Sequence, residues 1–379
     1  MTEKRTAFQK PIICLNLFFH NSKPEYFRER QLELVDKINY CLDTLPRVSR
    51  TFAPTIRMLP KGLNVPVTVA YLLCRIADTV EDSEVLTLDQ KKNILTMFAD
   101  IFVKSQPQSV SAFMALVEDF PRGNADDELV HHLPVVIDVF NSFSEGVRKH
   151  IAKWVVEMSM GMRKYAQSAR RRRFTFLNTM KELDEYTYYV AGTVGYLLTE
   201  LFSFYSRKIT PMIKHRLEQL AESFGKGLQL VNIIRDMTTD LKRGQSYIPE
   251  ELLTKYELTR GTIFEKENAD RVQRLFNELI RNAVKHLDQA LDYIILIPKE
   301  EARIRLFCML PLFWAMRTMQ KIQENTLALL DSEKIKIPRR IIRKEFYMAL
   351  VTMNSNRLMR RRYLNIRRDL EAILASEAA

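Results

Sequence analysis

Two acidic stretches of the sequence have the residue types and the spacing of a metal-binding face. The first, residues 71–82, contains Asp78, Glu81 and Asp82 together with Tyr71 and Arg75. On a helix, residues three and four positions apart share one face, so these side chains would lie close together. Three neighbouring carboxylates repel one another. A divalent cation is the simplest partner that makes such a face favourable, because hard cations bind carboxylate oxygens.

The second stretch begins about 150 residues later and has the same character. Asn232, Asp236 and Asp240 are spaced i, i+4, i+8, and Gln229 lies one turn before them. Two such ridges facing each other across a cavity would hold a cluster of Mg²⁺ ions. Mg²⁺ keeps several waters and is commonly completed by substrate phosphates rather than by a protein cage. The two ridges therefore predict a diphosphate ligand.

Composition predicts that these ridges lie on the helices of an all-α protein. The chain has 379 residues, of which 46% are hydrophobic and 27% charged, as in a globular protein with a sizeable core. Only 10 Gly and 14 Pro interrupt it. Alternating strand patterns and a strand–glycine-loop–helix unit are both absent from the sequence, which argues against a nucleotide-binding sheet. We expect the helix of the first ridge to start after Pro66, and another helix to span Pro24–Leu42.

Cysteine usage and hydropathy predict a cytoplasmic protein. Cys14, Cys41, Cys74 and Cys308 are scattered without metal-like spacing, which suits a reducing compartment. The apolar run near residues 12–19 is too short and poorly flanked for a signal peptide. No uninterrupted apolar run reaches the ~18 residues that span a bilayer. We therefore expect no transmembrane anchor.

The excess positive charge lies in the C-terminal tail. The net charge is +12, and residues 334–368 contain 12 Lys or Arg against Glu345 alone. We expect a single domain over residues 1–333, with a loose lead-in at residues 1–25, followed by a basic helical tail at residues 334–379. No nucleic-acid reading motif accompanies these charges, so nucleic acid is not an expected partner.

Two interpretations of this tail stay open. One is peripheral contact with an anionic membrane, at the inner face of the cell membrane, and the other is docking against the body of the protein. The tail residues that would supply the apolar part of a membrane contact are Phe346, Tyr347, Leu350, Val351, Leu358 and Met359. In either case we expect a monomer.

Three shorter motifs are ambiguous by themselves. Ser49, Arg50 and Thr51 suit a phosphate seat at a helix N-terminus, but Ser49 is equally suited to capping that helix. The run Arg170–Arg173 is typical of an exposed loop, with diphosphate contact as the alternative. The small residues at 191, 192 and 195 allow close approach of a neighbour or a ligand, and core packing is the more frequent use.

The order of these motifs resembles the squalene synthases of the squalene/phytoene synthase family, which are head-to-head prenyl transferases. The segments that carry the resemblance are Val48–Ala53, Tyr71–Asp82, Tyr186–Gly195, Gln229–Asp240 and Phe307–Pro311. A single Asp-x-x-x-Asp recurs by chance. Two of them, with Ser-Arg-Thr-Phe before the first and Tyr-x-x-Tyr-Val-Ala-Gly between them, form a specific pattern.

The resemblance implies an isoprenoid synthase helical bundle around a deep apolar cavity, and it implies roles for named residues. The expected metal ligands, for Mg²⁺ or alternatively Mn²⁺, are Asp78, Glu81, Asp82, Asn232, Asp236 and Asp240. The positions expected to contact farnesyl diphosphate are Ser49, Arg50, Thr51, Phe52, Tyr71, Arg75, Val190, Gly192, Gln229, Asn232 and Arg235. The expected catalytic residues are Tyr186, Arg75, Tyr71 and Phe307. For NADPH, the expected contacts are Arg75, Arg235, Lys334 and Lys336.

In this family, two farnesyl diphosphates first join into presqualene diphosphate, and hydride from NADPH then gives squalene. Tyr186 matches the tyrosine proposed as the base, although a free tyrosine, with a pKa near 10, is a poor one. Phe307 matches an aromatic position that lines the pocket for the second half, where a π-face stabilises cations.

Two departures from the eukaryotic pattern suggest a bacterial-type enzyme. Thr239 stands where eukaryotic enzymes have an acidic residue, and a basic tail stands where they have a membrane anchor. The alternatives are a dehydrosqualene or phytoene synthase without hydride transfer and, in a different class, a catalytically silent relative that acts as an assembly factor. Both acidic ridges are intact, which favours an enzyme.

Overall fold

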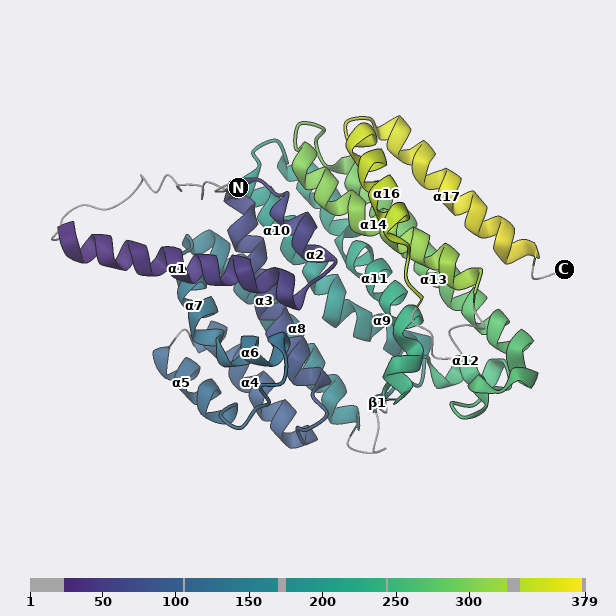
Figure 1. Cartoon of the computed structure of the whole chain (residues 1–379), viewed down its shortest axis with the longest axis horizontal. Helices are drawn as coiled ribbons and strands as arrows, with labels where there is room; N and C mark the ends of the chain where they lie inside the picture. The colour runs from purple at the N-terminus through teal and green to yellow at the C-terminus, as the bar shows by residue number, and fades with distance from the viewer. Residues whose placement is uncertain (1–23, 105, 170–174, 243–244, 326–334, 377–379) are drawn as a thin grey trace, which may run out of the picture.

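The protein is a bundle of helices, and a computed structural model describes residues 24–104, 106–169, 175–242, 245–325 and 335–376 (Figure 1). In chain order the first helices are α1 Pro24–Val48, α2 Phe52–Arg57, α3 Lys61–Asp82, α4 Leu88–Lys104, α5 Pro107–Leu116, α6 Ala125–His131, α7 Leu133–Asn141, α8 Glu145–Ala169, α9 Met180–Thr187, the π-helix η1 Tyr188–Gly192, α10 Thr193–Tyr205 and α11 Pro211–Lys242. They are followed by α12 Glu250–Lys255, the 3₁₀ turns η2 Thr262–Phe264 and η3 Lys266–Asn268, α13 Ala269–Leu296, α14 Ala302–Gln323, α16 Arg339–Thr352 and α17 Asn356–Ser376.

The all-α prediction is confirmed, with one small addition. Among the described residues, the strands are β1 Thr175–Phe176 and β2 Gln245–Ser246, which pair in parallel with Thr175 opposite Gln245. This short ladder therefore joins the segment before α9, the helix that contains Tyr186, to the segment after α11, the helix that carries the second ridge.

Two helices extend through prolines at which the sequence suggested an end. The first-ridge helix α3 begins at Lys61 rather than after Pro66, and α1 ends at Val48 rather than before Pro46. A proline inside a helix leaves the carbonyl four residues earlier without its partner. In α1 that carbonyl belongs to Leu42, and it accepts a hydrogen bond from Arg57 Nη2 at 3.2 Å. A neighbouring side chain thus supplies the missing donor.

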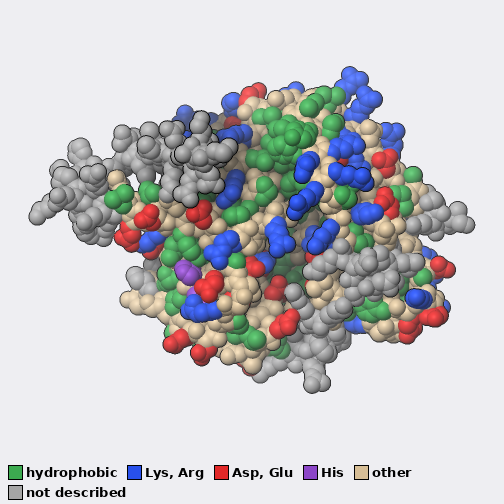
Figure 2. Space-filling view, in the orientation of Figure 1, with side chains coloured by type: hydrophobic (Ala, Val, Ile, Leu, Met, Phe, Trp, Pro, Cys, Tyr) green, Lys and Arg blue, Asp and Glu red, His purple; other side chains and the backbone are tan. Residues whose placement is uncertain are grey.

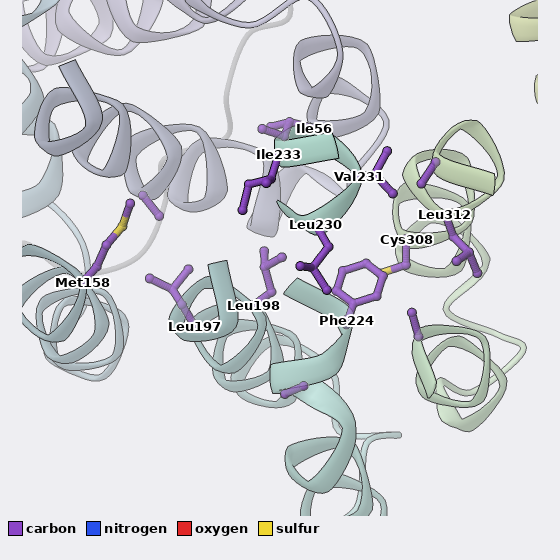
Figure 3. Close-up of a cluster of buried hydrophobic side chains, with 14 of the residues drawn as sticks. Ile56, Met158, Leu197, Leu198, Phe224, Leu230, Val231, Ile233, Cys308 and Leu312 are labelled. Atoms are coloured by element: carbon purple, nitrogen blue, oxygen red, sulfur yellow. The ribbon is translucent and has the colours of Figure 1, made fainter. Parts of the chain in front are cut away.

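The central helix of the bundle is α11, which is apolar on most sides over its middle turns. Leu230, Val231, Ile233 and Ile234 are all buried, and a helix buried on several sides is typical of a core position. The helix packs against α10, α13 and α14. Figure 3 shows its side chains beside those of α2, α10 and α14; the labelled residues are Ile56, Met158, Leu197, Leu198, Phe224, Leu230, Val231, Ile233, Cys308 and Leu312.

Glycines on two neighbouring helices make room for the wide turn of the π-helix η1. A Cβ on Gly225 of α11 would lie 1.9 Å from the carbonyl oxygen of Ala191, and one on Gly161 of α8 would lie 2.0 Å from Cγ of Tyr189. Just beyond η1, a Cβ on Gly195 would lie 1.9 Å from the carbonyl oxygen of Ala221. Close packing is therefore the use of these small residues, and it fixes α11 against η1 and α10.

We expect Gly225→Ala to destabilise the protein by about 1–3 kcal/mol or more, because overpacking against backbone cannot be relieved by a side-chain rotation. Thermal unfolding measures this effect. The matched control is Gly261→Ala, whose added Cβ meets nothing closer than Thr259 Oγ1 at 3.8 Å and whose φ of −80° suits alanine. Equal melting temperatures for the two variants would contradict the close approach.

The C-terminal helices α16 and α17 pack against the bundle through buried polar contacts. Glu345 of α16 is fully buried and pairs with Arg317 Nε of α14 at 2.8 Å and with Arg362 Nε of α17 at 3.2 Å. Asp288 of α13 accepts hydrogen bonds from Tyr363 Oη at 2.9 Å and from Arg367 Nε at 3.0 Å. The tail is therefore docked on α13 and α14, as one of the two interpretations of its sequence expected.

We expect Glu345→Ala to cost about 3–5 kcal/mol, because it leaves two guanidinium groups in a buried site without their counter-ion. Urea denaturation measures the loss. Glu324→Ala is the control, since that carboxylate is exposed and its ion pair with Lys321, at 3.4 Å, lies on the surface. A loss no larger than that of the control would mean that the tail is not docked through Glu345.

One described helix, α3, has the length and apolar composition of a membrane span, and 67% of the apolar window is buried inside the bundle. This helix also carries the first acidic ridge. Its apolar character is therefore accounted for by its position in the core.

Candidate active site

The two acidic ridges lie on helices that are held on either side of α10, which packs against both α3 and α11. The ridges face each other, because the carboxylate of Asp240 on α11 is one of the charges that raise the pKa of Glu81 on α3. Figure 2 shows a hollow near the middle of the visible face, with Lys and Arg side chains gathered above it and Asp and Glu side chains along its lower edge. The predicted juxtaposition of the ridges is present in the fold.

The first ridge is electrostatically strained without a cation. Burial raises the pKa of Asp78 from 3.8 to about 7, and the nearby Asp82 and Asp126 add to the shift while Arg75 opposes it. Burial also raises the pKa of Glu81 well above its usual value, and Asp82 contributes next. Desolvation and like charges both disfavour ionised carboxylates. A nearby cation would reverse both effects.

The second ridge contains its own internal partners. Arg235 forms an ion pair with the adjacent Asp236 through both Nε, at 3.1 Å from Oδ1, and Nη2. Asn232 Nδ2 lies 3.5 Å from Gln229 Oε1, at the limit of a hydrogen bond. These residues and Asp240 are all half-buried. The polar face of α11 thus lies in a recess while its apolar faces are in the core.

Arg75 has a partner that the sequence did not reveal. Its guanidinium donates from Nε to Asp126 Oδ1 at 2.8 Å and from Nη2 to Oδ2 at 3.1 Å, which is a bidentate pair. Asp126 lies in the first turn of α6, which is capped by the Asn124 side chain. The pair holds Arg75 beside the first ridge. No local pattern identifies Asp126, because its role depends on the packing of α6 on α3.

The structure places Ser49 at the start of α2, where it accepts a hydrogen bond from the helix although the N-cap residue is Thr51. Ser49 Oγ accepts a hydrogen bond from Phe52 N at 3.1 Å, and Ser49 is buried. The Ser49 side chain also lowers the otherwise raised pKa of Tyr71, and the ring centroids of Tyr71 and Phe52 are 6.0 Å apart. The start of α2 is therefore placed beside α3. The remaining members of this motif, Arg50 and Thr51, are exposed.

Tyr186 is paired with a second tyrosine that sequence reasoning missed. The rings of Tyr186 and Tyr247 are stacked, with centroids 4.7 Å apart, and each hydroxyl contributes to the pKa shift of the other. Burial raises the pKa of both groups, and the next largest cause is the carboxylate of Glu81. The tyrosine pair therefore lies next to the acidic ridges. Tyr247 follows β2, in the segment after the second ridge, and no spacing within that segment points to Tyr186.

The other predicted residues have varied surroundings. Val190 and Gly192 are in η1. Phe307 of α14 is buried, and its ring lies edge-on to Phe202 of α10 at 5.9 Å. Lys336 is exposed, whereas Lys334 and Arg170–Arg173 lie outside the described residues. The structure therefore brings the acidic ridges, Arg75 and Tyr186 together, and of the two predicted lysine contacts to NADPH it describes only the exposed Lys336.

The donor set fits a divalent cation that is shared with a phosphate ligand. Within the described residues, no three His, Cys, Asp or Glu side chains are close enough to enclose one ion. Asp240 of the second ridge nevertheless helps to raise the pKa of Glu81 on the first ridge, so negative charge from both ridges faces the gap between them. Mg²⁺ sites of this kind use one or two carboxylates and take their other oxygens from phosphate and water.

Comparison with known proteins shows the family. The family model described as squalene/phytoene synthase matches residues 45–340. The squalene synthase of Schizosaccharomyces pombe is 30% identical over 316 residues, which are 83% of this chain and 66% of that protein. The human squalene synthase is 28% identical over 306 residues, 81% of this chain and 68% of that protein. The chain belongs to the squalene/phytoene synthase family.

Solved structures agree on the fold. The structure of TcSQS with the ligand E5700 has a TM-score of 0.71 at 21% identity and covers 90% of this chain and 99% of that one. A dehydrosqualene synthase with a bound ligand has a TM-score of 0.59 at 21% identity, covering 86% and 99%. The isoprenoid synthase bundle is therefore confirmed, whereas the deep apolar cavity stays a prediction.

The expectation of a bacterial-type enzyme is not supported. The curated proteins described above are eukaryotic, and so is a probable squalene synthase of Neurospora crassa, which is 30% identical over 285 residues. That match spans 56% of the Neurospora protein. Thr239 is half-buried at the end of α11 and is a single position. One neutral residue beside an intact ridge does not identify a lineage.

Proposed function

We propose that this protein joins two farnesyl diphosphates head-to-head to presqualene diphosphate and reduces that intermediate with NADPH to squalene. The observation that carries the proposal is the pair of acidic ridges whose carboxylates interact across the gap between α3 and α11. Sequence similarity to squalene synthases over most of the chain supports the choice of reaction.

In this proposal the ridges bind the diphosphates through Mg²⁺ (or Mn²⁺). The ligands would be Asp78, Glu81, Asp82, Asn232, Asp236 and Asp240. When bound, the metal supplies Lewis-acid neutralisation of the leaving diphosphate. Arg75 and Arg235 present guanidinium groups beside the ridges, a geometry suited to phosphate oxygens. Since Arg235 is paired with Asp236 in the free protein, its movement to a phosphate would release that carboxylate for a metal.

Tyr186 would act in proton transfer beside the ridges. Its raised pKa means that the free protein holds the hydroxyl protonated, so Tyr186 donates a hydrogen bond in that state. Accepting a proton would require nearby positive charge, because a cation favours the phenolate. Phe307, buried between α14 and α10, would present an apolar aromatic surface to a cationic intermediate.

Reduction by NADPH is the more specific part of the proposal. Arg75 and Arg235 are two of the expected NADPH contacts, and each already has a carboxylate partner. Exposed Lys336 follows buried Ile335 at the point where the described chain resumes. We keep cytoplasmic location and a monomeric state as predictions.

Product analysis tests this function. The purified protein is incubated with farnesyl diphosphate and Mg²⁺, with and without NADPH, and the products are separated by chromatography and identified by mass spectrometry. We expect squalene only with NADPH and presqualene diphosphate without it. Dehydrosqualene in both conditions would assign the protein to the branch without hydride transfer. No turnover of farnesyl or geranylgeranyl diphosphate would contradict both assignments.

A further inference from the structure

We propose that the outward face of the C-terminal helical hairpin, α16 and α17, is a docking surface for an anionic lipid bilayer. This inference concerns a surface of the docked tail, and it goes beyond the proposed reaction. It uses residues that neither acidic ridge requires. Three observations carry it: exposed apolar side chains, unpaired arginines beside them in the hairpin, and a buried ion pair that fixes which face points outward.

The apolar patch consists of Tyr347, Leu350 and Val351 on α16. Their spacing of three and four puts them on one face, and they are 64%, 37% and 69% exposed. Arg343 and Lys344 precede them by one turn on the same face and are also exposed. An amphipathic helix with basic and apolar residues side by side is the usual form of an interfacial membrane contact.

The arginine stripe consists of Arg357, Arg361 and Arg368 on α17, spaced so that they share the exposed face with Leu364. Neither Arg357 nor Arg361 forms an ion pair with any of the described residues. A shallow groove runs along this face, and the residues that line it are Arg357, Arg360, Arg361, Leu364, Asn365 and Arg368. Uncompensated guanidinium groups in a groove attract phosphate-bearing headgroups.

Glu345 fixes which face of α16 points outward. Its carboxylate is fully buried between Arg317 and Arg362, and Ala349 and Thr352 are buried on the same side. Turning the apolar patch inward would expose this ion pair and bury the positive charges of Arg343 and Lys344. The packing of the hairpin on the bundle therefore keeps the apolar patch exposed to solvent.

The patch and the stripe are near one another because only residues 353–355 connect the two helices. Leu350, Val351 and the 44% exposed Leu358 lie within about one turn of this connection. Figure 2 shows hydrophobic and Lys or Arg side chains side by side over the region where Figure 1 places α16 and α17. The tip of the hairpin thus offers apolar side chains for the acyl region, flanked by positive charges for the headgroups.

The chemistry favours lipid over nucleic acid. Phosphate contact needs the arginines but gains nothing from exposed leucine and valine side chains. Single-strand binders use aromatic side chains as stacking platforms, and Tyr347 is the one aromatic residue of the patch. Aliphatic groups gain free energy by entering the acyl boundary of a bilayer. The two kinds of residue together match a charged lipid surface.

Vesicle sedimentation with the full-length protein tests the proposal. The vesicles contain phosphatidylcholine alone or mixed with phosphatidylglycerol, at low and high salt. We expect binding to the mixed vesicles at low salt, release at high salt and little binding to phosphatidylcholine alone, because the charges act within a Debye length. Binding to neither vesicle at low salt, or equal binding to both, would overturn the proposal.

Two double variants separate the charge from the apolar patch. Arg357→Gln with Arg361→Gln, and Tyr347→Ser with Val351→Ser, should each weaken binding by roughly tenfold or more. The matched controls are Arg207→Gln with Lys208→Gln, and Val103→Ser with Met212→Ser; these residues are as exposed but lie elsewhere, and the controls should bind as the wild type does. Melting temperatures confirm that each variant is folded.

The same variants decide between lipid and nucleic acid. Unchanged lipid binding by either double variant would overturn the docking surface. So would tight binding of single-stranded RNA that depends on the arginines and not on Tyr347 and Val351. Turnover of farnesyl diphosphate measured without vesicles should be unchanged in both variants, which separates this surface from the proposed active site. Failure of the proposed reaction would leave the vesicle result unaffected.

Discussion

Asp78→Asn should strongly reduce turnover and at the same time stabilise the protein. Asp78 is an expected metal ligand on the first ridge, and loss of one charged group that neutralises the diphosphate should lower kcat by roughly 10²-fold or more. In the free protein this half-buried carboxylate is disfavoured in its charged form by desolvation and by Asp82 and Asp126, and Arg75 offsets only part of that. A neutral amide of the same shape removes this repulsion.

The pH dependence of stability follows from the sign of the shift. The pKa of Asp78 is raised from 3.8 to about 7, so between these values the folded state binds more protons than the unfolded state. The free energy of unfolding therefore falls as the pH rises from about 4 to 7. At pH 8 Asp78→Asn should be more stable than the wild type by up to a few kcal/mol, since one pKa unit corresponds to about 1.36 kcal/mol.

Thermal melts at pH 5 and pH 8 without divalent cations measure this difference, and steady-state assays measure the turnover. Asp43→Asn is the control, because Asp43 is an exposed carboxylate on α1 and should change neither property. Near-normal turnover in Asp78→Asn would remove this residue from the metal site. A lower melting temperature at pH 8 would show that the carboxylate is favourably paired rather than strained.

Tyr186→Phe should lower kcat by about 10²–10³-fold, which is the usual range for loss of a positioned proton-transfer group. Tyr247→Phe should have a smaller effect, about tenfold, since this hydroxyl acts by holding that of Tyr186 in place. The rings are stacked at 4.7 Å, so removing one oxygen leaves the packing intact. The effects should not add, because the two rings are in contact and each hydroxyl affects the pKa of the other.

A double-mutant cycle in kcat measures this coupling, with melting temperatures for all variants. The matched control is Tyr293→Phe, another buried tyrosine that is stacked on a ring, at 5.1 Å from Phe224, and hydrogen-bonded to Thr199 at 2.8 Å. It should lose stability and keep its kcat. If Tyr186→Phe likewise loses stability and keeps its kcat, the tyrosine pair is part of the core and another group transfers the proton.

Much of the candidate site was predictable because its signals are local in the chain. The spacing of Asp78, Asp82, Asp236 and Asp240 places carboxylates on helix faces whatever the rest of the fold does. Helix type and the shared face follow from a fixed backbone period. The all-α class follows in the same way from scarce glycine and proline.

Contacts between distant segments could not be predicted in this way. Asp126 beside Arg75, Tyr247 beside Tyr186 and Glu345 between two arginines each join residues on separate elements. None has a spacing that a single segment reveals. The continuation of α1 through Pro46 is similar, because it depends on a hydrogen bond from Arg57 of the next helix.

The sequence by itself determined that two acidic helix faces exist, that they suit divalent cations and diphosphate, and that positive charge is concentrated in the tail. Only the tertiary structure decided that the ridges face each other, which tyrosines lie beside them and which face of the tail is exposed. The physical reason is that helix periodicity is a property of neighbouring residues. The direction in which each face points is set by packing between helices, here by glycines that let α11 approach η1 and by Glu345, buried on the inner side of α16.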